Sequence, residues 1–396
     1  MSRKVMCVFG TRPEANKMCP LVKELESRKE IEALVCVTAQ HREMLDQMLA
    51  IFDVHPQFDL NIMEKQQTLT TITSKAMLGL EEVFRQVKPD IVLVHGDTTT
   101  TFAAALAAFY NHVPIGHVEA GLRSFDLQSP YPEEANRRLV GVLADVHFSP
   151  TVNNAENLKR ENVQAPIFIT GNTAIDALKL TVKEDYVFED EALRQLDFGA
   201  RKVIAITAHR RENYGQPMEN IMEAFAHLAS NHPEVQLVYP VHLSPYVQEV
   251  AHRHLDGLDN VLLVQPLGVA DMHNLLARSY MVMTDSGGLQ EEAPALGKPV
   301  IVLRTETERP EVVEAGLALL AGVEEEGVYA AGNRASGGRG GRNGPGHRYG
   351  SGRVDCRGGG TAAGRGALSQ HGARRQSLWR WLCLPPDRGR PSVLPG

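Results

Sequence analysis

The 396-residue sequence predicts an α/β protein with two doubly wound domains, each a parallel sheet covered by helices on both faces. Short apolar runs alternate with stretches of helical composition, and this alternation restarts once, after Gly171. Near-continuous apolar strands are typical of parallel sheets that are buried on both faces. The expected strands are residues 4–9, 33–38, 90–94, 114–118, 146–149 and 167–170, then 202–207, 235–241, 260–264, 280–284 and 299–303.

The length of the chain also indicates two domains, because one hydrophobic core seldom extends beyond about 250 to 300 residues. We place the first domain at residues 1–171 and the second at residues 172–330. The boundary region is 171–201, where residues 183–191 are charged and only weakly periodic. In open parallel sheets, ligands bind at the carboxyl ends of the strands. Two such domains are therefore expected to face each other across a ligand-binding cleft.

Composition excludes several classes of protein. The five cysteines include no C-x-x-C pair, which favours a reduced, cytoplasmic chain. The first apolar run ends at Gly10, too short for a signal-peptide core. No run of about 18 apolar residues is present, so the sequence predicts neither export nor a membrane span.

The segment 331–396 differs from everything before it. It has 12 arginines, two aspartates and 17 of the 34 glycines, and its formal charge is +10 against −17 for residues 1–330. One interpretation is a disordered Arg/Gly-rich tail that binds nucleic acid. We favour a reading-frame error in a G+C-rich gene, and predict no nucleic-acid partner.

Residues 283–300 are the strongest candidate for a ligand site, because they predict a strand, a glycine turn and a helix. Free backbone amides at such a junction can hold a phosphate, and Ser286, Gly287 and Gly288 would let the anion approach. Glu292, in the first helical turn, would then contact a ligand hydroxyl such as one on ribose. The alternative is an ordinary capped helix with acids that complement its dipole.

A second candidate anion site follows the first strand. Arg12 and Lys17 lie in and just after Gly10-Thr-Arg-Pro-Glu14, and are placed to meet a negative group. The alternative is a solvated charged turn. The segment lacks the G-x-G-x-x-G fingerprint, so we predict no dinucleotide cofactor held in the usual way.

Titratable side chains follow several strands, where proton transfer is a common role. Asp97 and Glu119 end two strands, Glu133 opens a helix, and His209 follows the first strand of the second run. A metal site was the rival interpretation, because His95 with Asp97 and His117 with Glu119 each lie two residues apart. No helical ligand pair supports it, so we predict no metal.

Eight ordered motifs between residues 4 and 329 resemble those of the non-hydrolysing bacterial UDP-N-acetylglucosamine 2-epimerases. They are residues 9–14 (FGTRPE), 38–46 (TAQHREMLD), 95–98 (HGDT), 116–123 (GHVEAGLR), 132–137 (PEEANR), 209–212 (HRRE), 284–288 (TDSGG) and 307–310 (TERP). The family's C-terminal Asn-Pro-Tyr-Gly-Asp-Gly motif is absent in frame, but a shifted reading of residues 375–381 can encode it.

The resemblance implies two Rossmann-like domains of the GT-B fold, catalytic carboxylates in the first, UDP bound by the second, and a homodimer without a cofactor. It implies reversible conversion of UDP-GlcNAc to UDP-ManNAc at C2, with elimination of UDP to 2-acetamidoglucal and its re-addition. Residue by residue, it implies acid/base or catalytic roles for Asp97, Glu119, Glu133 and His209, and UDP-sugar contacts for Arg12, Lys17, Ser286, Gly287, Gly288, Glu292 and Arg309.

The same resemblance suggests two further contacts. Met272 stands where the family often has an aromatic residue against uracil. A second UDP-GlcNAc, acting as an activator, would use Gln40, His41, Gln67, Arg210 and His242, which could equally be structural polar groups.

Three other functions stay open on the sequence. A UDP-sugar glycosyltransferase of the same fold would need an acceptor. A hydrolysing epimerase would release free ManNAc and UDP. If the literal tail is made, the chain could be an inactive or merely UDP-sugar-binding protein. The sequence does not tell which carboxylate serves which epimer, or which polysaccharide the product would feed.

Overall fold

The computed structural model describes residues 2–39, 42–64, 67–307 and 309–336, and the chain forms two compact units that divide between Leu180 and Thr181. Unit 1 comprises the described residues up to Leu180, and unit 2 those from Thr181 onward. The division falls inside the 171–201 region. Helix α7 (Thr173–Thr181) spans it, and the short helix α8 (Glu191–Gln195) follows within unit 2.

Unit 1 contains a seven-stranded sheet in the order β3-β2-β1-β4-β5-β6-β7, in which every pairing is parallel. A parallel sheet needs crossover connections, and the sequence supplies them as helices between successive strands. The strands are β1 (Arg3–Phe9), β2 (Ile31–Val37), β3 (Phe58–Asp59), β4 (Ile91–His95), β5 (Ile115–Val118), β6 (Val146–Ser149) and β7 (Ile167–Ile169).

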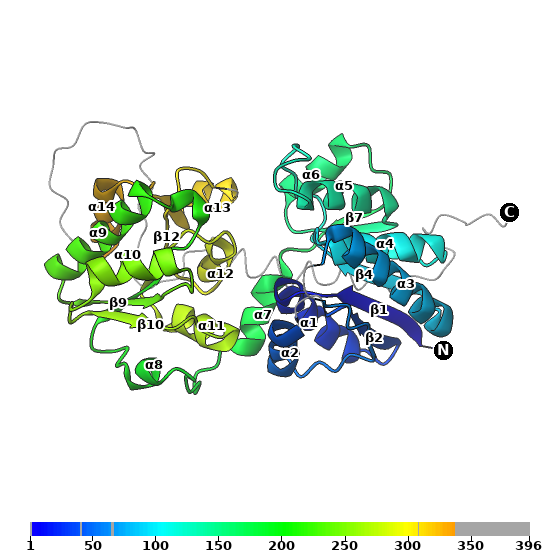
Figure 1. Ribbon diagram of the computed structural model, residues 1–396, viewed down its shortest axis with the longest axis horizontal. Coiled ribbons are helices and arrows are strands. Elements are labelled where there is room, and N and C mark those ends of the chain that lie inside the picture. Colours follow the sequence, from blue (N-terminus) through cyan, green and yellow to red (C-terminus); the bar gives the residue numbers. More distant parts are fainter. Residues whose placement is uncertain (1, 40–41, 65–66, 308, 337–396) are drawn as a thin grey trace. The chain divides into compact units, whose positions relative to one another are not determined.

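Helices cover both faces of this sheet (Figure 1). One core lies between the strands and the helices α3, α4 and α5, and includes Leu80, Phe84 and Val140. The alanine-rich face of α4 permits its close packing with α3 and α5. The helices are α1 (Arg12–Glu26), α2 (Arg42–Ile51), α3 (Leu69–Val87), α4 (Thr99–Tyr110), α5 (Glu133–Leu143) and α6 (Val152–Arg160), before α7.

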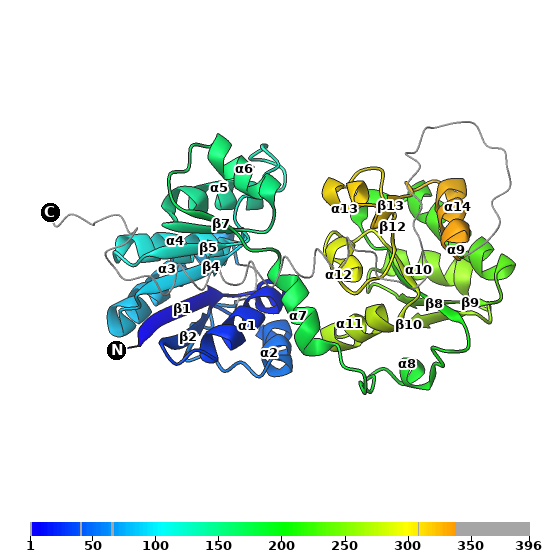
Figure 2. The ribbon, with the colours of Figure 1, turned by 180° about the vertical axis from the view of Figure 1, so that it is seen from behind.

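Unit 2 contains a six-stranded parallel sheet in the order β10-β9-β8-β11-β12-β13. One of its faces packs on helices α9, α10 and α14, and the other on α11 and α12 (Figure 2). The strands are β8 (Lys202–Thr207), β9 (Val235–Pro240), β10 (Val261–Val264), β11 (Met281–Thr284), β12 (Val300–Val302) and β13 (Ala318–Leu320). The helices are the 3-10 helix η1 (Arg211–Asn213), α9 (Gln216–Asn231), α10 (Pro245–Leu255), α11 (Val269–Arg278), α12 (Leu289–Ala295), α13 (Pro310–Glu314) and α14 (Glu325–Ser336).

These two doubly wound sheets confirm the predicted α/β class with two Rossmann-like units, the GT-B fold class. In each unit the strand order reverses beside the first strand, between β1 and β4 and between β8 and β11. Ligands of such sheets bind where the order reverses, at the carboxyl ends of the strands. The loops after these four strands are therefore the ones to inspect.

The second folded unit extends further toward the C-terminus than the sequence predicts. Helix α14 continues to Ser336, past the change of composition at residue 331, and Val328 and Ala331 belong to the unit 2 core. Residues 337–396, most of the anomalous tail, lie outside the described residues. Within the described part of the chain, no helix has the length and apolarity needed to cross a membrane.

Candidate functional site

Asp97 and Arg12 follow the two strands at which the order of the unit 1 sheet reverses. Arg12 is the first residue of α1, is exposed, and comes three residues after β1. Asp97 comes two residues after β4 and immediately before Thr98, the N-cap of α4. The predicted anion-facing arginine and the first predicted carboxylate therefore lie at the carboxyl edge of the sheet, after neighbouring strands.

Glu119 lies directly after the next strand, β5, with its backbone at φ +61°. A residue with a Cβ rarely adopts this left-handed conformation, and such strain is commonest at functional positions. The Glu119 carboxylate pairs with the ammonium of Lys17 from α1, and its Oε2 lies 3.3 Å from Nε2 of His95. Lys17 is thus a direct partner of a predicted catalytic carboxylate.

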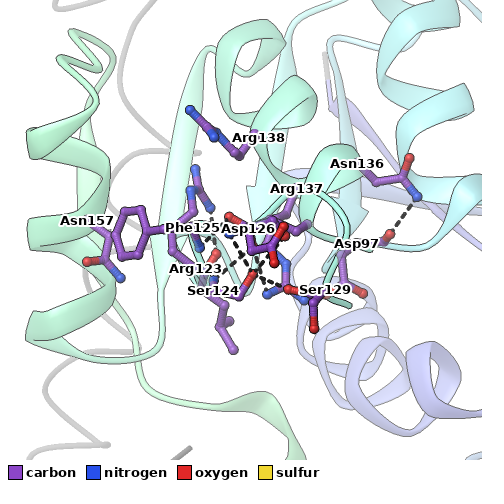
Figure 3. Close-up of polar contacts among 12 residues, drawn as sticks. Asp97, Arg123, Ser124, Phe125, Asp126, Ser129, Asn136, Arg137, Arg138 and Asn157 are labelled. Carbon is purple, nitrogen blue, oxygen red and sulfur yellow. Dashed lines mark hydrogen bonds and ion pairs between the residues drawn. The ribbon is translucent and has the colours of Figure 1, made fainter. Parts of the chain in front are cut away.

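Asp97 is held from helix α5 (Figure 3). The guanidinium of Arg137 pairs with the Asp97 carboxylate, and the Asn136 side-chain amide donates to the Asp97 carbonyl at 2.9 Å. Glu133 is the first residue of the same helix, four positions before Arg137, so both lie on one helix face.

The charges around Asp97 oppose one another. Burial raises the pKa of Asp97, the Arg137 guanidinium lowers it, and the negative charges of Glu119 and Glu133 raise it further. The other two predicted carboxylates therefore both act on the pKa of Asp97. A carboxyl group whose pKa is raised by burial and by like charges suits a role in proton exchange with a ligand.

His95 is buried beside this group, and burial lowers the pKa of His95 to about 4. It is therefore a neutral imidazole at pH 7. The other histidine of the rival metal interpretation, His117, donates from Nε2 to the Gly96 carbonyl at 2.7 Å. Among the described residues, no group of three or more His, Cys, Asp or Glu is arranged to hold a metal ion.

The buried carboxylate of Glu134 fixes the start of α5. Both oxygens of Glu134 accept backbone hydrogen bonds, from Ser124 at 3.0 Å and from Phe125 at 3.1 Å. Nη1 of Arg137 lies 3.3 Å from the same Glu134. The loop before α5 and the arginine that holds Asp97 are thus positioned together.

In unit 2, His209 follows β8 and Asp285 follows β11, the two strands at which the order reverses. Asp285 is fully buried, and its Oδ2 accepts from the backbone amides of His209 at 2.7 Å and Arg210 at 2.8 Å. The His209 ring stacks on that of His242, with 5.3 Å between centroids and 12° between planes. The predicted site residue His209 is therefore held in place by Asp285, which was not among the predicted site residues.

The predicted phosphate loop lies between β11 and α12. Ser286 and Gly287 are half-buried and Gly288 is exposed. The Ser286 amide donates at 2.9 Å to Thr284 Oγ1, so that this amide already has a partner. Glu292 lies one turn into α12, and a Cβ on Gly288 would come 3.6 Å from Glu292 Oε1.

The other predicted UDP contacts also lie in unit 2. Met272, on α11, packs partly buried against the core. Arg309 forms an ion pair with Glu291 of α12. The backbone amide of Arg309 donates to Thr307, whose hydroxyl in turn donates to Gln290. Arg309 is thus held against the helix that follows the phosphate loop.

The five predicted activator contacts are distributed over both units. In unit 1, Gln67 donates its side-chain amide to the Ile62 carbonyl. In unit 2, Arg210 lies 3.7 Å from Glu212, and His242 is exposed and stacked on His209. Gln40 and His41 lie outside the described residues.

Two residues near these groups were not selected from the sequence, Arg137 and Asp285, and His95 was named there only in the rival metal interpretation. Arg137 could have been found, because a basic residue four positions after Glu133 shares its helix face. Asp285 directly follows a predicted strand, but its role depends on the parallel pairing of β11 with β8. That pairing joins residues about 75 positions apart and leaves no local signal.

The two doubly wound units, with carboxylates after strands of one sheet and a Ser-Gly-Gly loop after a strand of the other, place the chain in the GT-B class of proteins. A family model described as UDP-N-acetylglucosamine 2-epimerase matches residues 23–357. The chain therefore belongs to the UDP-N-acetylglucosamine 2-epimerase family, a family of isomerases.

Individual proteins similar to this chain bear the name of the same family. The putative UDP-N-acetylglucosamine 2-epimerase of Thermotoga maritima is 60% identical over 326 residues, which are 82% of this chain and 86% of that protein. The UDP-N-acetylglucosamine 2-epimerase of Bacillus subtilis is 58% identical over 327 residues, 82% of this chain and 85% of that one. The crystal structure of the Neisseria meningitidis UDP-GlcNAc 2-epimerase bound to UDP-GlcNAc is 47% identical, with a TM-score of 0.73, and covers 83% of this chain and 90% of its own.

Proposed function

We propose that this chain interconverts UDP-GlcNAc and UDP-ManNAc by inverting C2. The C2 proton is removed and the bond between C1 and the UDP oxygen breaks, which leaves 2-acetamidoglucal and UDP. A proton then returns to the opposite face of C2, and UDP adds back to C1. Atoms balance, and neither an oxidant nor a cofactor is needed.

The observation that carries the proposal is the position of three carboxylates in unit 1, after β4, after β5 and at the start of α5. Asp97 pairs with Arg137 and Glu119 with Lys17, and the negative charges of Glu119 and Glu133 raise the pKa of Asp97. Removal of a weakly acidic C2 proton and its replacement from the other face require more than one positioned acid or base. The relatives from Bacillus subtilis and Neisseria meningitidis are named as 2-epimerases of UDP-N-acetylglucosamine, which supports the proposed class of reaction.

The remaining predicted residues would manage the leaving group. Diphosphate departure is favoured by donors that strengthen as negative charge develops. Arg12 and His209, with the Ser286-Gly288 loop, would supply them, while Glu292 contacts ribose and Met272 contacts uracil. In this proposal residues 1–171 are the catalytic domain and residues 172–330 the UDP-binding domain. Lys17 and Arg309 would line the same site.

The test supplies UDP-GlcNAc as the only substrate in heavy water. We expect UDP-ManNAc to form, and deuterium to appear at C2 of both epimers, which are recovered at equilibrium as UDP-sugars, as read by NMR. Asp97→Asn, Glu119→Gln and Glu133→Gln should each lower kcat by roughly 10²- to 10⁴-fold. Glu156→Gln, an exposed carboxylate paired with Lys159 on α6, is the matched control and should retain activity.

The rival functions give different results in this experiment. Free ManNAc and UDP would indicate a hydrolysing epimerase, and turnover only after addition of an acceptor would indicate a glycosyltransferase. Binding of UDP-GlcNAc without deuterium exchange would leave a UDP-sugar-binding protein. Mass spectrometry of the native protein should first establish whether the literal 331–396 segment is present.

Three accompanying properties are proposed on the same basis. The protein is a cytoplasmic homodimer, and a second UDP-GlcNAc activates it through Gln67, Arg210 and His242 together with Gln40 and His41. Sigmoidal dependence of the rate on UDP-GlcNAc, abolished by His242→Ala, supports the activator site. A hyperbolic dependence in the wild type removes it.

A further inference from the structure

Asp285 has one satisfied and one unsatisfied oxygen, although its side chain is completely buried. Oδ2 receives the backbone amides of His209 and Arg210, and lies 3.3 Å from the side-chain amide of Asn213. Oδ1 has no hydrogen-bond partner in the described structure. A buried carboxylate oxygen without a donor is costly, so its surroundings call for an explanation.

The His209 ring approaches this oxygen, with Nδ1 3.4 Å from Oδ1. This is slightly longer than an ordinary hydrogen bond, and such contacts in ligand-free sites often shorten when a ligand binds. The His209 ring also faces the stacked ring of His242. His242 Nδ1 already accepts from the Ser244 amide at 3.0 Å, so the proton of the neutral His242 ring lies on Nε2 and this ring does not accept a hydrogen bond from His209 Nδ1.

We propose that Asp285 is a positioning residue for His209. Its Oδ1 accepts a hydrogen bond from His209 Nδ1–H, and the ring then turns Nε2 toward the departing diphosphate. The inference rests on the proposed function for the role of His209, and goes beyond it by assigning the tautomer and its cause. The two ring nitrogens point in divergent directions, so fixing one fixes the other. The same carboxylate also holds the His209 backbone, and therefore sets both the position and the rotation of the ring.

Asp285 immediately precedes Ser286, so that it links two parts of the proposed leaving-group site. Through Oδ2 it holds the loop after β8, and through its own backbone it begins the loop after β11. Nε2 takes up a proton from solvent, and the Asp285 carboxylate stabilises the imidazolium that results. As the bond between C1 and the diphosphate breaks, Nε2–H passes this proton to the diphosphate oxygen on which negative charge develops, and His209 returns to the neutral form with its other proton retained on Nδ1. The transferred proton returns to Nε2 when UDP adds back.

The first test measures the tautomer of His209 in the full-length protein saturated with UDP, by NMR of ¹⁵N-histidine at a pH at which the ring is neutral. His209→Gln identifies the signals. We expect a protonated Nδ1 and an unprotonated Nε2. The opposite tautomer in the wild-type protein overturns the proposal without any variant.

Asp285→Asn should reverse the tautomer. Its single oxygen is required by the two backbone amides of His209 and Arg210, so the new NH₂ group faces Nδ1 and donates to it, which moves the ring proton to Nε2. Asn213→Ala is the matched control, because it removes a donor to Oδ2 and leaves Oδ1 unchanged. An unchanged tautomer in Asp285→Asn would contradict the proposal.

Kinetics separate positioning from a merely structural role. Asp285→Asn should lower kcat by about 10²-fold or more with little change in KM, while Asn213→Ala stays close to wild type. In the His209→Ala background, Asp285→Asn should cost little more, because both changes act through one ring. Equal and additive losses overturn the inference. If the wild-type protein lacks epimerase activity, the proposed function fails, and the tautomer measurements still decide the inference.

Discussion

At the level of single residues, Asp97 is subject to two opposing effects. Burial and the neighbouring carboxylates raise the pKa of Asp97, and Arg137 lowers it. Arg137→Met removes the lowering effect, so the acidic limb of the profile of kcat/KM against pH should move to higher pH, with a lower maximal rate. The measurement is the pH dependence of UDP-GlcNAc epimerisation.

Arg138→Met is the control for this prediction. Arg138 is the next residue on the same helix, but its guanidinium lies 3.4 Å from Glu161 rather than against Asp97 (Figure 3). Its profile should therefore match that of the wild type. If the two variants shift the acidic limb equally, Asp97 is not the group that titrates there.

The sequence could predict residues of the site that follow strands, but not their partners. Asp97 and Glu119 each come within two residues of a strand end, which is a local signal. The ion pair of Asp97 with Arg137 and the pairing of Glu119 with Lys17 join residues 40 and 102 positions apart. The residues that tune the site therefore emerge only when the sheet order is known.

At the level of elements, Glu14 joins the starts of two helices. Its Oε2 accepts from the backbone amides of Gly10 and Thr11, at 3.1 and 2.8 Å, which caps α1. Its Oε1 accepts from the hydroxyls of Thr98 and Thr101 at the start of α4, at 2.8 and 3.1 Å. The loops that present Arg12 and Asp97 are therefore positioned by one buried carboxylate.

We expect Glu14→Ala to destabilise the protein by about 2–3 kcal/mol, because it leaves two buried amides without an acceptor. Glu14→Gln should cost about 1 kcal/mol, since its oxygen can still accept from the amides while the hydroxyls rotate to accept from its NH₂ group. Urea denaturation measures both values. Equal costs for the two variants would show that the amides are satisfied in another way.

The pH dependence of stability gives an independent check on Glu14. Burial raises its pKa in the folded state above the ordinary value of 4.5, so the folded protein binds more protons than the unfolded chain just above that pH. This contribution to stability is fully present at lower pH and is lost as the pH rises through the folded pKa. Glu14→Gln has no group that titrates at this position. As the pH rises through the folded pKa, the free energy of unfolding of the wild type should therefore fall relative to that of the variant.

Element prediction was accurate where apolar runs are long. The eleven expected strands are present, whereas β3 (Phe58–Asp59) and β13 (Ala318–Leu320) were not predicted. Both are short strands at sheet edges, and their pairing with β2 and β12 rather than their composition makes them strands. Helix α14 was obscured because the composition changes within it.

At the level of the whole molecule, each named hydrophobic core is built from one unit. Phe84 is buried with residues of α4 and α5 in unit 1, and Phe225 is buried with β8 and α10 in unit 2. Phe84→Ala and Phe225→Ala should each cost about 3–5 kcal/mol, because each leaves a cavity that its surroundings only partly fill.

Hydrogen exchange with mass spectrometry can assign this cost to peptides of one unit or of both. We expect exchange to accelerate mainly in residues 2–180 for the first variant and in residues 181–336 for the second, since local opening follows the cooperative unit that loses its packing. Equal acceleration throughout the chain would instead mean that the two sheets unfold as one cooperative body, and that the division after Leu180 has no energetic counterpart.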